Sequence, residues 1–321
     1  MNLFEQLKEL PKVDMHINLT SSISTNLASY LMDDENLALI IDKMQEKNLM
    51  DYENSLKLPI KILKSTKNLT LAINDLIDNL EKNNVIYAEL FLDLPLYNKR
   101  LNEEKTLETI LDVVKLRNYN LNVVLVLSSE KDKEDNLKTL NLFEKYYQKG
   151  VNGIYFKKDK MTSLENYSYI FSRLIKNSYP YILNMNSKIT NPDKEIYLNA
   201  KRIIYSLPNI DELFLKEVKE HNIMLEFGIT RFRENNLIDD FKNYFIYDLI
   251  KENYSIDIAS FDMTTLNIDI LNEWCILFNN YPFTLHDIVK IMINSLINAN
   301  IDDTIKNKLI DDIKEKANLM L

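Results

Sequence analysis

Short apolar runs alternate with longer amphipathic stretches along almost the whole sequence, and this alternation constrains the fold more than any other feature. Helix-length stretches include residues 106–119, 133–148, 163–177 and 211–221. Eight apolar runs rich in Val, Ile, Leu, Tyr and Phe have the length of buried strands: 13–19, 85–94, 121–128, 151–157, 181–186, 202–206, 223–227 and 255–259. Eight strands with helical crossovers predict an α/β fold, a (β/α)8 barrel of the TIM type.

The sequence shows no linker between domains, because it lacks Pro/Gly/Ser-rich and low-complexity stretches. We therefore expect a single domain over residues 1–321. Residues 24–82, between the first two strands, form a long insert that reads as several helices. Further helices are expected at about 285–318, and Thr284 is a suitable N-cap for the first of them.

The composition excludes several kinds of site. The 321 residues include 3 Gly, 3 His and 1 Cys. One Cys excludes a disulfide framework and a Cys-rich zinc module, and three Gly cannot form a glycine-rich phosphate loop. The formal net charge is −9 and no basic block is present, so we expect no nucleic-acid partner.

Nothing in the sequence predicts contact with a membrane. No apolar run approaches the roughly 20 residues that a membrane-spanning helix requires. The first twelve residues carry charge early and lack the apolar region of a signal peptide. Together with the single Cys, this favours a reducing, cytoplasmic setting.

Polar residues recur where the predicted strands end, which is where barrels of this kind place their active sites. Alternation along the first strand puts Asp14, His16 and Asn18 on one face. The fifth strand ends near Asn184, and Asp262 follows the eighth. These side chains are therefore candidates for a shared site at the barrel mouth.

Five segments, in order along the chain, resemble motifs of the adenosine deaminase family. Residues 10–19 (LPKVDMHINL) resemble its opening LPKxxLHxHLDG, and residues 87–90 (YAEL) its YxEx motif. Residues 150–154 (GVNGI) resemble GVxGxDLAGxE. Residues 244–263 resemble HPxxxLxxxGVxVxxNTDDP, and the segment from 283 to 295 resembles LTxEEL…RNS. The resemblance covers residues 10 to about 317.

The resemblance implies zinc-dependent deamination of a purine. Members of the family hold one zinc ion through the HxH motif of strand one, a His of strand five and an Asp of strand eight. The metal lowers the pKa of bound water and so supplies a hydroxide nucleophile. A Glu acts as general acid and base, and a further His orients the nucleophile that attacks the amino-bearing carbon.

Carried over to this sequence, the zinc ligands are mostly replaced. His16 matches the first ligand, whereas Asn18 and Asn184 stand where the family has His. Phe261 stands where the family has the ligand Asp. Because a catalytic zinc site needs three or more protein ligands, we expect no bound metal or other cofactor.

The remaining catalytic and substrate-binding positions also differ. Ser187 replaces the catalytic Glu, and Tyr205 replaces the assisting His. Thr20 replaces an acidic ribose contact, and Lys158 replaces a Gly that lets the base approach the backbone. Asp262 matches the Asp that binds the purine in the family.

We therefore expect an adenosine-deaminase-like protein that has lost zinc-dependent purine deamination. Such a pseudoenzyme would bind a purine nucleoside or related small molecule, or a protein partner. Thr20, Glu89, Lys158 and Asp262 are the candidate ligand pocket. The insert 24–82 is an alternative docking surface.

A second functional hypothesis is a divergent amidohydrolase or nucleoside deaminase that uses a different residue set in the same mouth. The candidate residues for this hypothesis, which are also a candidate site for a hard cation, are Asp14, His16, Asn18, Glu89, Asn184 and Asp262.

Each candidate also has a structural interpretation. A single His in a strand, such as His16, is typical of a hydrogen-bonded core residue. Asp262 is placed to cap a following helix. The side chains of Tyr205 and Phe261 are expected to pack into the volume that the metal occupies in the family.

The two acidic residues near the end of strand two have a structural interpretation of their own. Glu89 and Asp93 are expected to form ion pairs with Lys157 or Lys158, which end strand four.

Overall fold

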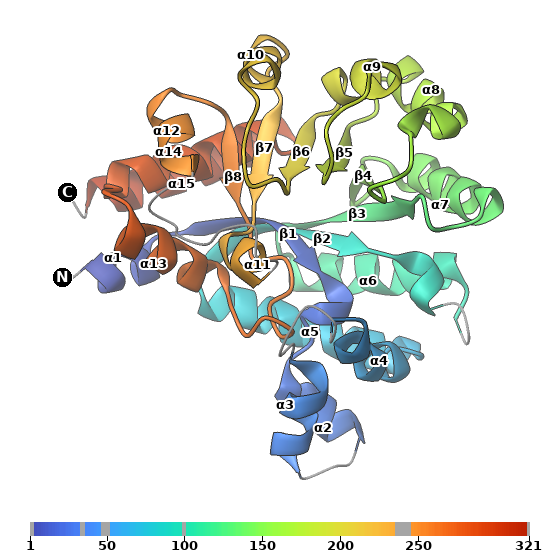
Figure 1. Cartoon of the computed structure of the whole chain (residues 1–321). Helices are drawn as coiled ribbons and strands as arrows, with labels where there is room; N and C mark the ends of the chain where they lie inside the picture. Colours follow the sequence, from blue (N-terminus) through green and yellow to red (C-terminus); the bar gives the residue numbers. More distant parts are fainter. Residues whose placement is uncertain (1–2, 33–35, 46–51, 98–100, 235–244, 320–321) are drawn as a thin grey trace.

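Eight parallel strands form the centre of the molecule (Figure 1). The computed structural model describes residues 3–32, 36–45, 52–97, 101–234 and 245–319. The strands follow one another in chain order: β1 (Lys12–Asn18), β2 (Val85–Leu92), β3 (Leu121–Ser128), β4 (Val151–Lys157), β5 (Tyr181–Met185), β6 (Arg202–Tyr205), β7 (Met224–Phe227) and β8 (Ile256–Ile258).

Backbone hydrogen bonds join β1 to the residues that follow β8 and so bring the two edges of the sheet together. Asn18 N donates to Phe261 O and Phe261 N donates to His16 O, each at 2.8 Å. The eight parallel strands thus form a nearly closed barrel, and the predicted (β/α)8 fold is confirmed.

Helices surround this barrel. In the N-terminal half they are α1 (Leu3–Glu9), α2 (Thr25–Met32), α3 (Leu37–Met44), α4 (Tyr52–Ile62), α5 (Thr66–Lys82), α6 (Glu103–Arg117) and α7 (Lys133–Tyr146). In the C-terminal half they are α8 (Ser168–Lys176), α9 (Lys194–Leu198), α10 (Glu212–Glu220), α11 (Ile229–Glu234), α12 (Ile246–Lys251), α13 (Ile270–Asn280), α14 (Leu285–Asn298) and α15 (Asp303–Asn318). None of the described helices has the length and apolar character needed to cross a bilayer.

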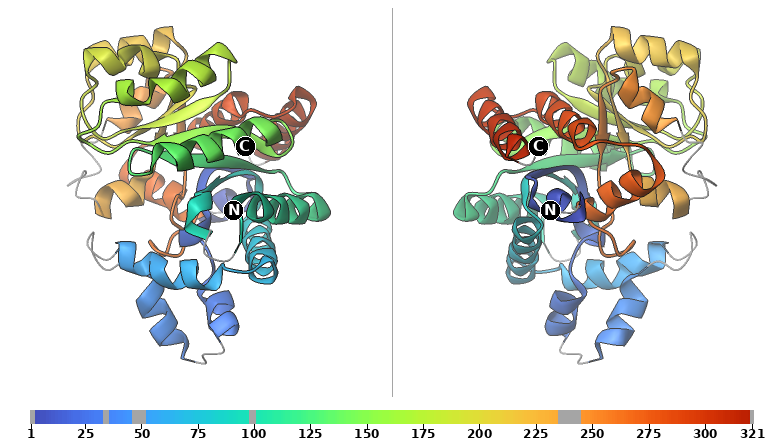
Figure 2. Two further views of the ribbon diagram at one scale, coloured as in Figure 1. Left: turned by 90° about the vertical axis from the view of Figure 1, so that its right-hand side faces the viewer. Right: turned by 90° about the vertical axis from the view of Figure 1, so that its left-hand side faces the viewer.

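The extra helices lie where the sequence predicted them. The insert after β1 carries α2 to α5, and α2 and α3 project away from the barrel (Figures 1 and 2). The chain ends with α14 and α15. Thr284 caps α14 through a reciprocal capping box with Asp287, because each side chain bonds the other's backbone N–H. The short helices α9 and α11 were not predicted, because each spans only five or six residues.

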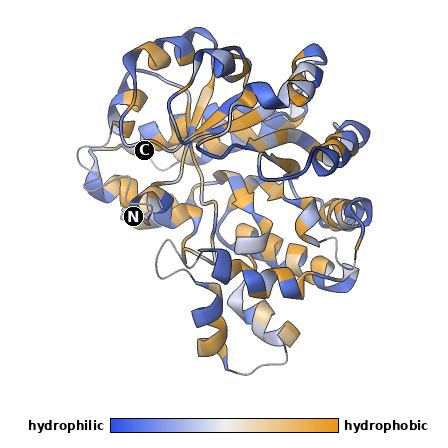
Figure 3. Cartoon of the chain, turned by 45° about the vertical axis from the view of Figure 1, so that its right-hand side comes forward, coloured by the Kyte–Doolittle hydropathy of each residue, from blue (hydrophilic) through white to orange (hydrophobic). Residues whose placement is uncertain are grey.

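The apolar side chains form two separate layers, and the strands run orange through the centre of Figure 3. The larger layer lies between the strands and the helices. The smaller one fills the inside of the barrel: Phe91, Val124, Val126, Ile182, Ile204, Ala259 and Phe261, with Tyr155 packed against them. Since side chains alternate along a strand, this inner layer fixes which residues face the barrel interior.

Candidate functional site

The imidazole of His16 lies inside the barrel between two aromatic rings. Strand β1 directs it inward, and the ring is stacked on Phe91 with centroids 3.4 Å apart. The Phe261 ring lies at 4.1 Å and the Tyr155 ring at 5.9 Å. Only 2% of His16 is exposed, so the residue that matches the first zinc ligand is enclosed by rings.

Both ring nitrogens of His16 have a neighbour. Nδ1 lies 2.6 Å from Glu226 Oε1, and Nε2 lies 3.3 Å from Asn18 Oδ1. Burial raises the pKa of Glu226 to about 8. Burial and the Arg202 guanidinium lower the pKa of His16 well below its usual range. At neutral pH we therefore assign a neutral imidazole beside a protonated carboxyl.

Arg202 crosses the barrel interior and links two buried acidic side chains, Glu89 and Glu226. Its Nη2 donates to Glu89 Oε2 at 2.7 Å. Its Nε lies 2.8 Å from Glu226 Oε2, within ion-pair distance but not aligned as a hydrogen bond. Glu89 Oε1 also accepts a hydrogen bond of 2.9 Å from Tyr87. One cation thus compensates two carboxyl groups away from water.

The predicted ion pairs of Glu89 and Asp93 with Lys157 or Lys158 are wrong. Glu89 points into the barrel, where Arg202 is its partner. Asp93 lies beyond the end of β2 and pairs at 2.7 Å with Lys131. The prediction failed because it considered only that these residues lie near the ends of β2 and β4, and it ignored that the Glu89 side chain points into the barrel.

Asp262 is the most heavily contacted side chain of the mouth. Its Oδ1 accepts hydrogen bonds from Asn18 Nδ2 at 2.8 Å, Ser21 Oγ at 2.5 Å and the Tyr52 hydroxyl at 3.1 Å. Its Oδ2 pairs with the Arg231 guanidinium. The alternative role as a helix N-cap is not observed, because Asp269 caps the next helix, α13.

Arg231 keeps Asp262 ionised and covers the rings below it. Burial alone would raise the pKa of the Asp262 carboxyl, but Arg231 and the hydrogen bonds from Ser21 and Asn18 hold it below its usual value. The guanidinium carbon lies 5.4 Å from the Phe261 ring centre and 5.7 Å from that of Tyr52. Its side chain remains 34% exposed, so Arg231 forms the outer surface of this cluster.

Phe261 fills the barrel interior, as expected from its structural interpretation. It is 2% exposed and adopts a left-handed backbone with φ of 59°. A Cβ atom at Gly228 would lie 2.7 Å from the Phe261 ring. Glycine at 228 therefore lets the chain turn from β7 into α11 against that ring, and this turn places Arg231 over the mouth.

Asn184 and the residues after β5 bind the loop that follows β4. Asn184 Oδ1 accepts from Lys158 N at 2.6 Å, and its Nδ2 donates to Lys158 O at 2.9 Å. Asn186 Nδ2 donates to the same carbonyl at 2.9 Å. The carboxamide of Asn184 is therefore used to hold backbone. Lys158, only 5% exposed, directs its Nζ to Ser187 Oγ at 3.2 Å and Asp159 O at 3.3 Å.

Tyr205 points away from the mouth, whereas Thr20 lies in the turn that follows the C-terminal end of β1. Tyr205 follows the inward-facing Ile204 and lies outside the barrel, with its ring 5.9 Å from Phe214 and its hydroxyl donating to Asn209 O. The prediction that Tyr205 fills the metal volume is therefore wrong, because alternation turns it to the helix side. Thr20 pairs with the Tyr97 hydroxyl at 2.7 Å.

The candidate pocket residues thus lie in separate environments. Thr20 contacts Tyr97, Glu89 contacts Arg202 deep in the barrel, and Lys158 contacts Ser187. Asp262 alone among them belongs to the Arg231 cluster.

Several residues of the site were not predicted. Glu226 and Arg202 stand in short apolar strands, and a buried charge there must find a partner. A charged residue within an apolar strand was therefore a signal that the sequence already contained. No comparable signal marks Arg231 or Tyr52, which reach the mouth from α11 and from the start of α4.

The donor set at the four positions matched to zinc ligands differs from the family's set in chemistry. Phe261 has no donor atom, and the carboxamide of Asn184 is bonded to backbone. Asn18 donates to Asp262 while its oxygen faces His16. Within the described ranges, no group of three or more His, Cys, Asp and Glu side chains is arranged to hold a metal ion. The residues present do not fit the family's zinc ion.

Comparison with known proteins agrees with this architecture. The adenosine deaminase of Clostridium perfringens is 23% identical over 327 residues, covering 94% of this chain and 98% of the relative. The structure of Arabidopsis ADAL complexed with IMP matches with a TM-score of 0.83 at 16% identity, over 99% of this chain and 100% of that one. An amidohydrolase from Burkholderia ambifaria with bound zinc matches with a TM-score of 0.79 at 14% identity, over 99% and 95%.

At such low identity the two solved structures show the fold alone, whereas the family model covers nearly the whole sequence. The model described as adenosine deaminase matches residues 11–316 of the 321. This chain therefore belongs to the adenosine deaminase family.

Proposed function

We propose that this family member does not deaminate purines by the zinc mechanism and acts instead by binding a ligand or partner. The observation that carries the proposal is the contact set of His16 and Asp262. Both nitrogens of His16 face protein oxygens, and Asp262 is held by Asn18, Ser21, Tyr52 and Arg231. In the family these two positions face the metal and the purine.

The chemistry of the replaced ligands supports the proposal. A zinc-bound water reaches a pKa near 7, whereas bulk water has a pKa near 15.7. Neutral Asn is a weak zinc ligand and Phe is none, so one imidazole remains of four ligands. Without the metal, this site has no means of forming hydroxide at neutral pH.

The proton-transfer groups of the family are missing as well. Ser187 stands at the position of the catalytic Glu and accepts a hydrogen bond from Lys158. A serine hydroxyl does not ionise near neutral pH, so it cannot replace a carboxylate as general acid and base. Tyr205, at the position of the assisting His, lies outside the barrel beside Phe214. This chain therefore lacks the residues that the family uses for metal activation and for acid–base catalysis.

The filled mouth bears on the kind of ligand. Related structures hold the purine nucleotides IMP and GMP. In this chain, a purine at the family position would have to push aside the Phe261 ring, or it would have to separate the Arg231 guanidinium from Asp262. We therefore propose a binding role that uses other surfaces of the protein.

A divergent deaminase remains the second candidate, and the His16–Glu226 pair is the observation that favours it. A carboxyl and an imidazole 2.6 Å apart that share a proton could transfer it to a substrate. Such a substrate would have to pass between Phe91 and Phe261, which enclose the imidazole.

A deamination assay tests the proposal. The purified chain is incubated with adenosine, AMP and N6-methyl-AMP, with and without added zinc, and product is followed by chromatography. The adenosine deaminase of Clostridium perfringens is the positive control. We expect no product above the uncatalysed rate. Turnover that a chelator abolishes would refute the proposal. Turnover that survives chelation and is lost in Glu226→Gln would establish the second candidate.

A further inference from the structure

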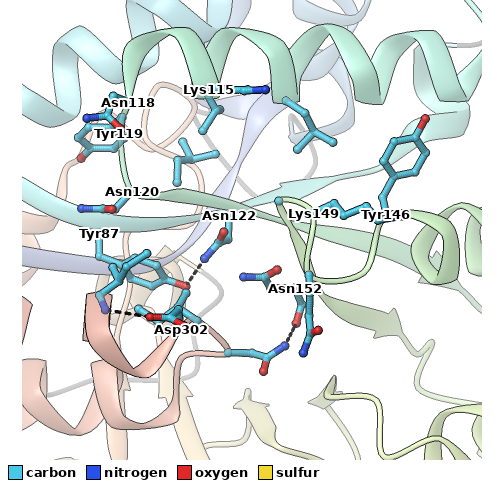
Figure 4. Close-up of a pocket in the computed structure, with 18 of the residues that line it drawn as sticks. Tyr87, Lys115, Asn118, Tyr119, Asn120, Asn122, Tyr146, Lys149, Asn152 and Asp302 are labelled. Atoms are coloured by element: carbon cyan, nitrogen blue, oxygen red, sulfur yellow. Dashed lines mark hydrogen bonds between the residues drawn. The ribbon is translucent and has the colours of Figure 1, made fainter. Parts of the chain in front are cut away.

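A large cavity lies at the opposite end of the barrel from the mouth. It measures about 1190 Å³ and is bounded by the C-terminal part of α6, the start of β3, the turn between α7 and β4, and the connection from α14 to α15 (Figure 4). These segments all lie at the N-terminal ends of the strands. None of the mouth residues His16, Asp262 and Arg231 lines the cavity. Its volume exceeds that of many small-molecule sites.

Carboxamide groups are the most frequent polar groups on the cavity wall. Six side chains supply them: Asn118, Asn120, Asn122, Gln148, Asn152 and Asn300. Each carboxamide is uncharged and offers both donors and an acceptor. A ligand with several hydroxyl groups has the same double capacity, because each hydroxyl donates one hydrogen bond and accepts others.

Three phenol rings accompany the carboxamides. Tyr87 and Tyr119 lie on one side in Figure 4, and Tyr146 lies toward the other. The hydroxyl of Tyr87 is fixed, since it accepts from Asn122 Nδ2 at 3.1 Å and donates to Glu89. Aromatic rings beside carboxamides suit the apolar C–H face and the hydroxyl edge of a sugar ring.

The charges on the wall disfavour an anion. Four acidic side chains line the cavity, against two lysines: Glu108, Asp112, Asp302 and Asp303, with Lys115 and Lys149. The acidic excess repels a phosphate group. The cavity therefore differs from a nucleotide site in charge.

One acceptor of the wall has no hydrogen-bond partner among the residues that the structure describes. Asn152 Oδ1 is inaccessible to solvent and accepts no hydrogen bond, although Asn300 Nδ2 donates to the Asn152 backbone carbonyl at 2.9 Å. Leaving a buried acceptor unpaired destabilises the protein. A hydroxyl donated by a ligand in the cavity, after a small rotation of this carboxamide, would satisfy it.

We propose that this N-terminal cavity binds a neutral ligand that carries several hydroxyl groups, as free sugars and nucleosides do. The carboxamides recognise the hydroxyls, the partly exposed rings of Tyr119 and Tyr146 pack against the sugar ring, and the acidic excess selects against phosphate. The site is independent of the chemistry at the mouth, so it stands whether or not the chain deaminates purines.

Calorimetric titration of the full chain with maltose, inosine and IMP tests this site. We expect inosine to bind more tightly than IMP, because the two differ by a phosphate. Binding of maltose would assign the recognition to the hydroxyl groups alone, and binding of inosine without maltose would assign the ligand to the nucleosides. Absence of binding by both, or tighter binding of IMP, would overturn the proposal.

Two variants locate the binding. Asn120→Ala and Asn152→Ala each remove one carboxamide, and each should weaken binding about threefold to tenfold, the worth of one hydrogen bond. Asn199→Ala is the matched control, because Asn199 is also exposed and, like Asn120, donates one bond to a backbone carbonyl. Circular dichroism confirms folding. Unchanged affinity in both folded cavity variants would place the ligand elsewhere and refute the proposal.

Discussion

The two ends of this barrel use their polar groups in opposite ways. At the mouth, polar side chains are bonded to one another: Asp262 alone has four partners, and rings enclose His16. At the N-terminal face, carboxamides line an open cavity of about 1190 Å³, and Asn152 Oδ1 has no partner among the described residues. The difference teaches that polar side chains at one end of a barrel can bond to one another while those at the other end border open space.

The interior between the two ends is held by buried charge. Arg202 joins Glu89 to Glu226, Glu226 contacts His16, and Tyr87 joins Glu89 to Asn122 at the cavity floor. Hydrogen bonds and ion pairs therefore run from the cavity to the mouth.

The largest expected effect comes from removing the cation of the interior. Arg202→Met leaves Glu89 and Glu226 buried without a partner cation, and loss of one partner of a buried pair costs about 3–5 kcal/mol. The free energy of unfolding in urea measures it. Arg173→Met is the control, because the Arg173–Glu144 pair lies at the surface and should cost less than about 1 kcal/mol. Equal losses in the two variants would contradict a charge-held interior.

A matched pair of glycine substitutions compares the two ends directly. Phe261 at the mouth and Gln148 at the cavity both adopt φ of 59°, so glycine relieves the same backbone strain at each. Phe261→Gly also removes a buried ring and should cost about 2–4 kcal/mol in unfolding free energy. Gln148→Gly removes an exposed side chain and should change it by less than about 0.5 kcal/mol. A small loss in Phe261→Gly would show that its ring does not fill the mouth.

The pH dependence of stability should reveal the buried carboxyl groups. Burial raises the pKa of Glu226 to about 8, and those of Asp14 and Glu273 to about 7, above the values near 4 of the unfolded chain. Between these values the folded state holds protons that the unfolded state has lost. Stability therefore falls as pH rises.

The window from pH 6.5 to 8.5 covers the titration of these groups, and Lys12, whose pKa burial lowers to about 8, opposes the fall only near its upper end. His16, whose pKa is lowered in the fold, is neutral there and adds little. We expect the free energy of urea unfolding to fall by roughly 2 kcal/mol across this window. Glu226→Gln, which resembles the protonated carboxyl, should flatten the slope, whereas the exposed Glu212→Gln should leave it unchanged. A rise in stability across the window would contradict the assignment of protonated carboxyls.

The sequence predicted the fold well because the fold depends on patterns of several residues. Each of the eight apolar runs overlaps a strand, with β1 beginning one residue earlier than its run, and the Thr284 cap lies where its neighbours indicated. The site was predicted less well because it depends on the direction in which each individual side chain points. In β6, the inward direction of Ile204 turns Tyr205 outward. No local pattern places Arg231 over Asp262, since that contact joins residues brought together only by the closed barrel.

The central claim is that the mouth of this family member offers no zinc site. Native mass spectrometry after incubation with equimolar zinc tests it most directly, with the zinc-bound Burkholderia ambifaria amidohydrolase as control. We predict that the control retains zinc while this chain appears at its metal-free mass. One zinc ion per chain, lost in His16→Ala but retained in His221→Ala, would contradict the claim.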